Sequence, residues 1–128
     1  MKLGYTILYV DDVVATIEFY EKAFGFARTV VVEGSYGELD TGATKLAFAA
    51  KTNALELFPV PLQPAGKDTN PPAFEVGFVT DDVQAAFDVA VKAGATALAP
   101  PKQKPWGQTV AYVRDLNGFL VELCTPMG

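Results

Sequence analysis

The groups in this chain that can carry chemistry are carboxylates, tyrosines and one thiol, because none of its 128 residues is histidine. That absence excludes Ser-His-Asp and Cys-His nucleophile pairs, histidine general bases and zinc sites built on imidazole. Two carboxylates stand out, since Glu75 and Glu122 each interrupt an apolar run. They are the candidate catalytic residues if the protein is an enzyme, and Glu122 is the better candidate for a general base.

Several aromatic and polar residues are candidates for contact with a ligand. Trp106 follows a proline in a predicted loop, where its ring is equally suited to stacking on a planar ligand and to capping the core. Arg114 is able to bind a carboxylate or to neutralise Glu122. Cys124 has no histidine to deprotonate it, so we assign it no chemistry. The predicted ligand-binding residues are Tyr5, Ile7, Tyr9, Ala47, Trp106, Gln108, Tyr112 and Arg114.

An internal repeat must position these residues, because Asp11-Asp12-Val13 recurs as Asp81-Asp82-Val83, an offset of 81 minus 11, or 70. An apolar run precedes each Asp pair, and an amphipathic helical pattern follows it. The aspartates are suited to cap the first helical turn, and Gly25 and Gly94 are suited to end the two helices. Each half therefore begins with a strand and a helix.

Three short strand-like runs follow each predicted helix, so each half has the order βαβββ. Asn117-Gly118 predicts a hairpin between the last two strands. The expected first module covers residues 1–56, a proline-rich linker 57–72 includes a helical turn near 54–58, and the second module covers 73–128. The predicted strands are 3–10, 26–32, 36–40, 44–50, 73–79, 96–99, 108–114 and 119–124.

The fold class is α+β, because a βαβββ unit leaves one face of its sheet uncovered by its helix. Two such units must pack together or form a curved sheet around a shared cleft. Strand alternation places Tyr5, Ile7 and Tyr9 on the cleft side of the first strand, and the offset of 70 carries Tyr5 onto Glu75. The same alternation places Glu122 on the cleft side of the last strand.

Two stretches give the chain a resemblance to a known family. The run from Ile17 to Phe26, IEFYEKAFGF, and the ending from Asp115 to Leu123, DLNGFLVEL, resemble the vicinal oxygen chelate superfamily. That superfamily holds glyoxalase I, extradiol dioxygenases and bleomycin-resistance proteins, and the resemblance covers nearly the whole chain. Its motifs are specific for the fold and weak for any one activity. The resemblance also implies a homodimer, often with a cleft shared between subunits.

In metal-dependent members of that superfamily, four side chains bind a metal ion, and the resemblance places those positions on Tyr5, Ala47, Glu75 and Glu122. Ala47 is placed by matching Asp40 to Asp115 in the two hairpins. Only Glu122 keeps the usual identity. Alanine cannot bind a metal ion and tyrosine is a poor ligand for nickel or zinc, so we favour no metal cofactor.

Two alternatives leave a divalent metal open. A different strand register would bring in Glu56 as the missing carboxylate. Glu75, Glu122 and Tyr5 would also suit magnesium or manganese with water completing the shell. A third reading needs no metal: both glutamates meet solvent at a cleft rim or pair with Arg114 or Lys45. If the two lie close together without a cation, one should have a raised pKa.

The leading hypothesis is a metal-free small-molecule-binding protein of the bleomycin-resistance type, with a cationic or amphipathic ligand in an acidic, aromatic cleft. The alternative is a lyase, epimerase or dioxygenase relative that uses Glu75 and Glu122, and a third hypothesis is a module with a vestigial cleft. The net charge of -5 argues against nucleic acid and anionic membranes as partners. The longest charge-free stretch is ten residues and contains three prolines, so no membrane span is predicted, and we expect a cytoplasmic protein.

Overall fold

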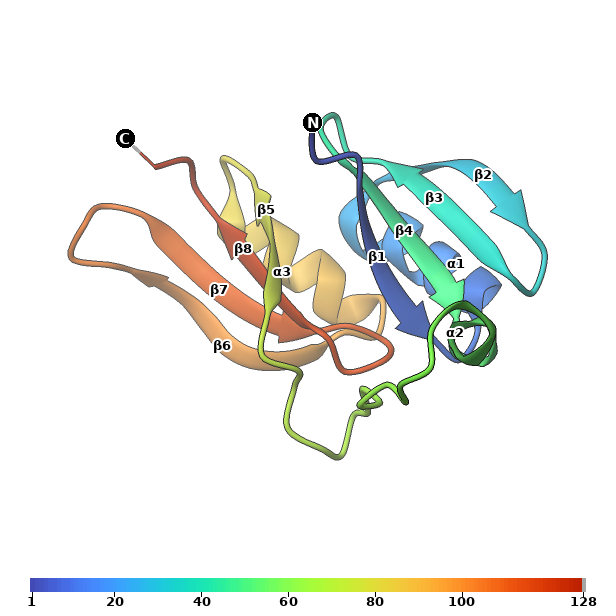
Figure 1. The fold of residues 1–128 in the computed structure, drawn as a ribbon. Coiled ribbons are helices and arrows are strands. Elements are labelled where there is room, and N and C mark those ends of the chain that lie inside the picture. The colour runs from blue at the N-terminus through green and yellow to red at the C-terminus, as the bar shows by residue number, and fades with distance from the viewer. Residues whose placement is uncertain (128) are drawn as a thin grey trace. The chain divides into compact units, whose positions relative to one another are not determined.

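The computed structural model describes residues 1–127 and divides into two compact units. The first unit is Met1–Pro64, and the second begins at Ala65. Each unit contains one four-stranded sheet with a helix against one face (Figure 1). The predicted α+β class and the βαβββ order of both halves are confirmed.

The first unit has the sheet order β1-β4-β3-β2, in which β1 and β4 are parallel and the other pairs are antiparallel. Helix α1 buries Ile17 and Tyr20 against the sheet residues Leu39 and Phe48, and all four side chains are fully buried. The elements are β1 (Tyr5–Val10), α1 (Val13–Phe24), β2 (Ala27–Val32), β3 (Tyr36–Asp40), β4 (Lys45–Ala50) and α2 (Lys51–Leu57).

The second unit repeats this plan with the order β5-β8-β7-β6. The two helices begin alike, because Asp12 accepts a hydrogen bond from the Ala15 N–H and Asp82 accepts one from the Ala85 N–H, both at 3.0 Å. The aspartates therefore cap α1 and α3 as predicted. The elements are β5 (Glu75–Val79), α3 (Val83–Lys92), β6 (Thr96–Gln103), β7 (Thr109–Arg114) and β8 (Leu120–Cys124).

The strand registers show which positions of the two units are equivalent. Ile7 lies opposite Ala47 in the parallel pair β1–β4, and Gly77 lies opposite Glu122 in the parallel pair β5–β8. Since Ile7 and Gly77 are related by the offset of 70, Ala47 and Glu122 occupy equivalent positions. The correspondence between Ala47 and Glu122 that was predicted from the two hairpins is therefore confirmed.

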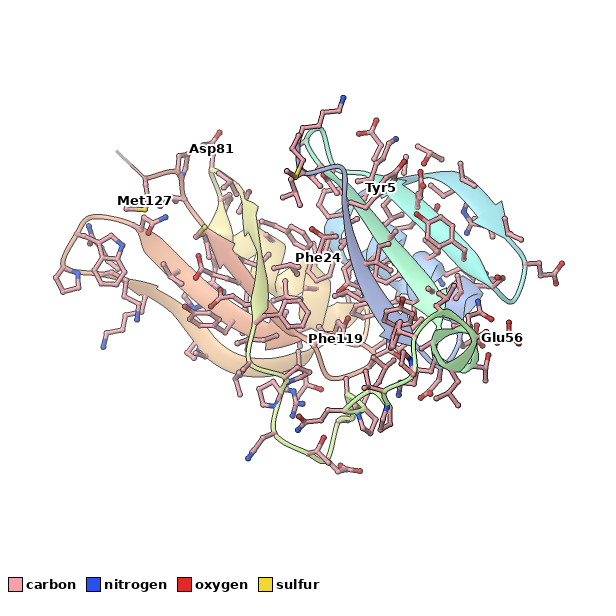
Figure 2. All side chains as sticks on the ribbon, in the orientation of Figure 1. Tyr5, Phe24, Glu56, Asp81, Phe119 and Met127 are labelled. Carbon is pink, nitrogen blue, oxygen red and sulfur yellow. The ribbon has the colours of Figure 1, made fainter. Side chains whose placement is uncertain are left out.

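Two sequence-based expectations need correction. Glu56 does not belong to a strand: it is an exposed residue of α2, which begins directly after β4 at Lys51 (Figure 2). The register that would have placed Glu56 at a metal position is therefore wrong. The predicted strand ending at Ala99 continues to Gln103 as β6, with two register shifts against β7. Its prolines are accommodated because β6 is an edge strand.

Membrane insertion through a helix finds no support in residues 1–127, where none of the helices has the length and apolar character that a bilayer span requires.

Candidate functional site

The face of the second sheet that α3 leaves uncovered carries a cluster of ionisable side chains. Val113, Val121 and Leu123 are buried on the face toward α3, so the alternate residues Tyr112 and Glu122 point to the opposite face. Tyr112 lies directly opposite Glu122 in the antiparallel pair β7–β8. Edge strand β5 adds Glu75, and β8 adds Cys124 two residues beyond Glu122. We call these four residues the carboxylate cluster: Glu75, Tyr112, Glu122 and Cys124.

Glu122 is the centre of the carboxylate cluster because the other three members all influence its pKa. The Tyr112 hydroxyl donates to Glu122 Oε1 at 2.9 Å. The Cys124 thiol donates to the Phe78 carbonyl at 3.8 Å, and Glu75 and Cys124 lie close enough to Glu122 to influence its pKa. The Tyr112 hydrogen bond thus fixes the orientation of the Glu122 side chain, which is itself only half-buried.

These contacts move the pKa values of the two glutamates in opposite directions. Burial, together with the hydrogen bond to Glu122 and the charge of Glu122, raises the pKa of Glu75. Burial also acts to raise the pKa of Glu122, but hydrogen bonds from Cys124, Tyr112 and Glu75 outweigh it and hold that pKa below its usual range. Glu75 is therefore the member with the raised pKa, which agrees with the prediction of one raised pKa in a close pair.

Tyr112 and Cys124 remain proton donors at neutral pH. Burial and then the hydrogen bond and charge of Glu122 raise the pKa of Tyr112 to about 12. The same two causes raise the pKa of Cys124 to about 11. A thiol with so high a pKa is a poor nucleophile at neutral pH, so Cys124 is not a candidate for nucleophilic catalysis, as predicted.

Open space lies beside the cluster at Gly77. A methyl group added at Gly77 would have the Glu122 Oε2 atom, at 4.0 Å, as its neighbour on the sheet face. No side chain of the second unit fills that position, so Glu122 Oε2 is accessible from the Gly77 side. A glycine within a strand often marks a place where another group approaches closely.

Arg114 has a structural role instead of a place in the carboxylate cluster. Its side chain is buried and donates to three backbone carbonyls: Nε to Gly118 at 2.9 Å, Nη1 to Lys67 at 3.1 Å and Nη2 to Gly66 at 2.8 Å. The described residues contain no ion pair between Arg114 and Glu122. The guanidinium group therefore fixes residues 66 and 67 against the β7–β8 hairpin.

Trp106 and Gln108 lie away from the carboxylate cluster, at the tip of the β6–β7 hairpin. The last paired residues before that tip are Gln103 and Thr109, whereas Tyr112 pairs further along, with Ala99. The Trp106 Nε1–H donates to Gln108 Oε1, and Gln108 Nε2–H donates to the Thr125 carbonyl, both at 2.7 Å. The structure thus separates two of the predicted ligand-binding residues from Glu75 and Glu122.

The predicted residues of the first unit lie on the face of its sheet that is opposite α1. Tyr5 is exposed (Figure 2). Ile7 is also exposed, Ala47 is fully buried, and the Tyr9 ring meets the Phe58 ring edge-on at 6.1 Å. No prediction covered Tyr36 and Glu38 on this face, although their spacing of two residues in a strand was an available signal.

The Tyr36 hydroxyl donates to Glu38 Oε2 at 2.8 Å. Burial, followed by the hydrogen bond and charge of Glu38, raises the pKa of Tyr36 to about 12. Glu38 lies opposite Ala47 in the β3–β4 pair, just as Tyr112 lies opposite Glu122 in the β7–β8 pair. Each unit therefore carries one tyrosine–carboxylate hydrogen bond on the sheet face that its helix leaves uncovered.

The side chains present do not fit the four-ligand metal site that the superfamily implies. Of the four implied positions only Glu122 keeps the usual carboxylate, and its equivalent in the first unit, Ala47, offers no donor atom. Within residues 1–127, no three histidine, cysteine, aspartate or glutamate side chains are grouped so as to hold a metal ion.

Comparison with known proteins matches the fold and the sequence motifs to one superfamily. An uncharacterized protein of Mycobacterium bovis is 30% identical over 126 residues, covering 94% of this chain and 80% of that protein. A glyoxalase-related enzyme from Fulvimarina pelagi is 22% identical with a TM-score of 0.84, covering 98% of this chain and 88% of that one. A glyoxalase/bleomycin resistance protein/dioxygenase family enzyme from Burkholderia phytofirmans is 24% identical with a TM-score of 0.81, covering 98% of each chain.

Residues 2–123 match the sequence pattern of the same superfamily. The predicted resemblance to the vicinal oxygen chelate proteins is thereby confirmed. The chain belongs to the Glyoxalase/Bleomycin resistance protein/Dioxygenase superfamily.

Proposed function

We propose that this protein is a small-molecule-binding member of its superfamily that works without a resident metal and binds a cationic or amphipathic ligand at the carboxylate cluster. One observation carries the proposal: Glu75 and Glu122 lie on neighbouring strands on the sheet face opposite α3, close enough to influence each other's pKa, and the Tyr112 hydroxyl fixes the orientation of Glu122. A cation can replace the proton at this pair, because its charge offsets the repulsion between the two ionised carboxylates.

The cation would reach Glu122 through the open space beside Gly77. Glu122 Oε1 receives the Tyr112 hydroxyl, whereas Oε2 faces the space at Gly77. A ligand with a planar cationic group and an apolar body would place its charge at Glu122 and its apolar part against neighbouring surface such as Val79, which is exposed on the same strand face.

Binding of benzamidine, an aromatic cation, tests the proposal against benzamide, its neutral counterpart. We expect saturable shifts of the backbone amide resonances of Gly77 and Glu122 with benzamidine, and none with benzamide. Glu122→Gln should weaken binding at least about tenfold, since that corresponds to the loss of one charge-assisted contact. Glu33→Gln, which removes an exposed carboxylate in the first unit, is the matched control. Equal binding of benzamidine and benzamide would contradict the proposal.

A second candidate function is enzymatic proton transfer, which the opposite pKa shifts of Glu75 and Glu122 favour. A pair of carboxyl groups with separated pKa values can divide the roles of acid and base. Ionised Glu122 would accept a proton next to a substrate carbonyl, and protonated Glu75 would donate one, as in a lyase, epimerase or dioxygenase relative. Exchange of the carbon-bound protons of hydroxyacetone in heavy water, lost in Glu122→Gln, would support this candidate. An unchanged exchange rate in that variant would remove it.

The proposal also includes a homodimer in the cytoplasm, with no nucleic acid or membrane as partner. The superfamily resemblance supports the dimer, and the single cysteine fits a reducing compartment. Sedimentation velocity at two protein concentrations measures the first part: a single species of twice the chain mass of 13.7 kDa is expected, and a single species of the chain mass would contradict it.

A further inference from the structure

The hairpin that joins β6 to β7 forms an open depression that the proposed function does not use. The volume of this depression is ≈ 530 Å³, within the range of small-molecule sites. Its lining consists of Lys102, Gln103, Lys104, Pro105 and Trp106. We call it the hairpin pocket, and all of its residues belong to the second unit.

Trp106 is held rigidly while its ring stays accessible. Its side chain is 63% exposed, yet its Nε1–H is bound to Gln108, which is bound in turn to Thr125. The turn that carries it is closed by the Gly107 N–H donating to the Lys104 carbonyl at 2.9 Å, and Gly107 has a φ of 105°, which favours glycine. A ring fixed in this way loses little conformational freedom when a planar group stacks on it.

The hairpin pocket is positively charged although the protein as a whole is acidic. The chain has a net charge of -5, but no aspartate or glutamate occurs between Asp88 and Asp115. Neither Lys102 nor Lys104 forms an ion pair with any residue from 1 to 127. Two lysines without a partner carboxylate, on a stretch free of acids, therefore create a local positive potential.

Strand register separates the hairpin pocket from the carboxylate cluster. Lys102 lies opposite Val110, so it shares the uncovered sheet face with Val110 and Tyr112. It belongs to edge strand β6, whereas Glu122 lies two strands away in β8. At about 4.8 Å between neighbouring strands, that places the two backbones on the order of 10 Å apart across the sheet. The two sites therefore have opposite charge and separate positions.

We propose that the hairpin pocket binds a small aromatic anion. Its phosphate, sulfonate or carboxylate group would lie between the ammonium groups of Lys102 and Lys104, and its ring would stack on Trp106. Lysine suits this task as a strongly hydrated point charge that meets an anion in many orientations. The proposal is independent of the function proposed for the carboxylate cluster, since it requires a ligand of the opposite charge.

Nuclear magnetic resonance tests the proposal directly, because Trp106 is the one tryptophan of the chain and its Nε1–H gives a single indole signal. The probes are phenyl phosphate, inorganic phosphate and neutral benzamide. We expect phenyl phosphate to shift the indole signal saturably, and inorganic phosphate to bind at least about tenfold more weakly because it lacks the ring. Benzamide should have no effect.

Variants separate this site from its surroundings. Replacing both Lys102 and Lys104 by glutamine should weaken phenyl phosphate at least about tenfold, while Lys92→Gln, at an exposed lysine of α3, should not change it. Trp106→Leu, followed through the amide signal of Gly107, should weaken phenyl phosphate but not inorganic phosphate. Unchanged affinity in the double lysine variant would overturn the proposal. Loss of phenyl phosphate binding in Glu122→Gln would also overturn it, since the ligand would then belong to the carboxylate cluster.

Discussion

Tyr112 and Glu122 face each other across the β7–β8 pair, and the tyrosine hydroxyl donates to the glutamate at 2.9 Å. The hydroxyl fixes the carboxylate in place, and the carboxylate stabilises the protonated phenol. The pKa of Tyr112 therefore depends on the charge of Glu122. Titration of the tyrosine detects that charge without a known ligand.

Removing the charge of Glu122 should lower the pKa of Tyr112. The value of about 12 arises from burial and from the hydrogen bond and charge of Glu122, so Glu122→Gln should move it part of the way toward the ordinary value of 10.0. Ultraviolet absorbance of the phenolate measures this titration. Glu38→Gln is the matched control, because it should shift Tyr36 and leave Tyr112 unchanged. A Tyr112 titration that does not respond to Glu122→Gln would show that burial alone sets its pKa.

Loss of the Tyr112 hydroxyl should destabilise the protein by about 1 kcal/mol, the usual net contribution of one hydrogen bond. Tyr112→Phe removes the donor and leaves the ring, so packing is retained. Urea unfolding measures the change in the free energy of unfolding. Tyr36→Phe removes the similar 2.8 Å bond to Glu38 and should have a comparable effect. If neither variant loses stability, water replaces both hydrogen bonds at no cost in the free energy of unfolding.

Glu75→Gln should change how stability depends on pH. The pKa of Glu75 in the folded protein lies above its ordinary value of 4.5, so its contribution to stability is present below that value and is lost as the pH rises through the folded pKa. Glutamine cannot ionise, so the variant should gain stability relative to the natural protein as the pH rises from acid to neutral. The gain should be at most about 1 kcal/mol, because Glu75 is exposed and solvent screens its charge.

Thermal unfolding at a series of pH values measures this difference between Glu75→Gln and the natural protein. If the stability difference stays constant from acid to neutral pH, the pKa of Glu75 is the same in the folded and unfolded chains, which would contradict the prediction.

Cys124 should react slowly with thiol reagents in the folded protein. Its thiol is buried and has a pKa of about 11, so only about one molecule in a thousand carries the thiolate at pH 8. Iodoacetamide modification followed by mass spectrometry measures the rate, and unfolding in urea should raise that rate by more than about tenfold. Rapid modification of the folded protein would contradict the burial and hydrogen bonding of this side chain.

Gly118→Ala should be strongly destabilising. Gly118 has a φ of 93°, and an added methyl group would lie 2.6 Å from the Gly66 carbonyl carbon and 2.9 Å from Arg114 Nη2. Gly34 has a φ of 74° but nothing within 4 Å of an added methyl group, so Gly34→Ala isolates the cost of the backbone conformation. We expect about 1 kcal/mol for Gly34→Ala and at least about 2 kcal/mol more for Gly118→Ala in urea unfolding. Equal losses would mean that residues 66 and 67 move aside freely.

The repeat explains why much of the fold could be predicted from the sequence. The paired Asp motifs mark both helix starts, and alternation within strands assigned Glu75, Tyr112 and Glu122 to one sheet face. Two contacting carboxylates follow from that assignment, because β5 and β8 are neighbours. These features depend on the spacing of residues a few positions apart, which can be seen in a single sequence.

Features that depend on distant backbone could not be predicted. Arg114 was a candidate ligand-binding residue, but two of the three carbonyls that accept its protons come from a loop nearly fifty residues earlier. Carbonyl groups are present at every residue, so no sequence pattern marks these acceptors. Trp106 was grouped with the carboxylates for a similar reason: the length of the β6–β7 hairpin depends on register shifts near Pro100 and Pro101, and that length separates Trp106 from Glu122.

A fragment of the second unit made by proteolysis or recombinant expression must keep residues 66 and 67 to retain its stability. A fragment starting at Ala73, where sequence repetition alone would place the cut, would leave Arg114 with two of its three carbonyl acceptors missing. A hydrogen bond from a charged group contributes about 1.5 to 3 kcal/mol net of solvation, so the loss of two should destabilise the fragment. The segment between the two repeats is therefore part of the second hairpin's support, and its length and path are constrained by one guanidinium group.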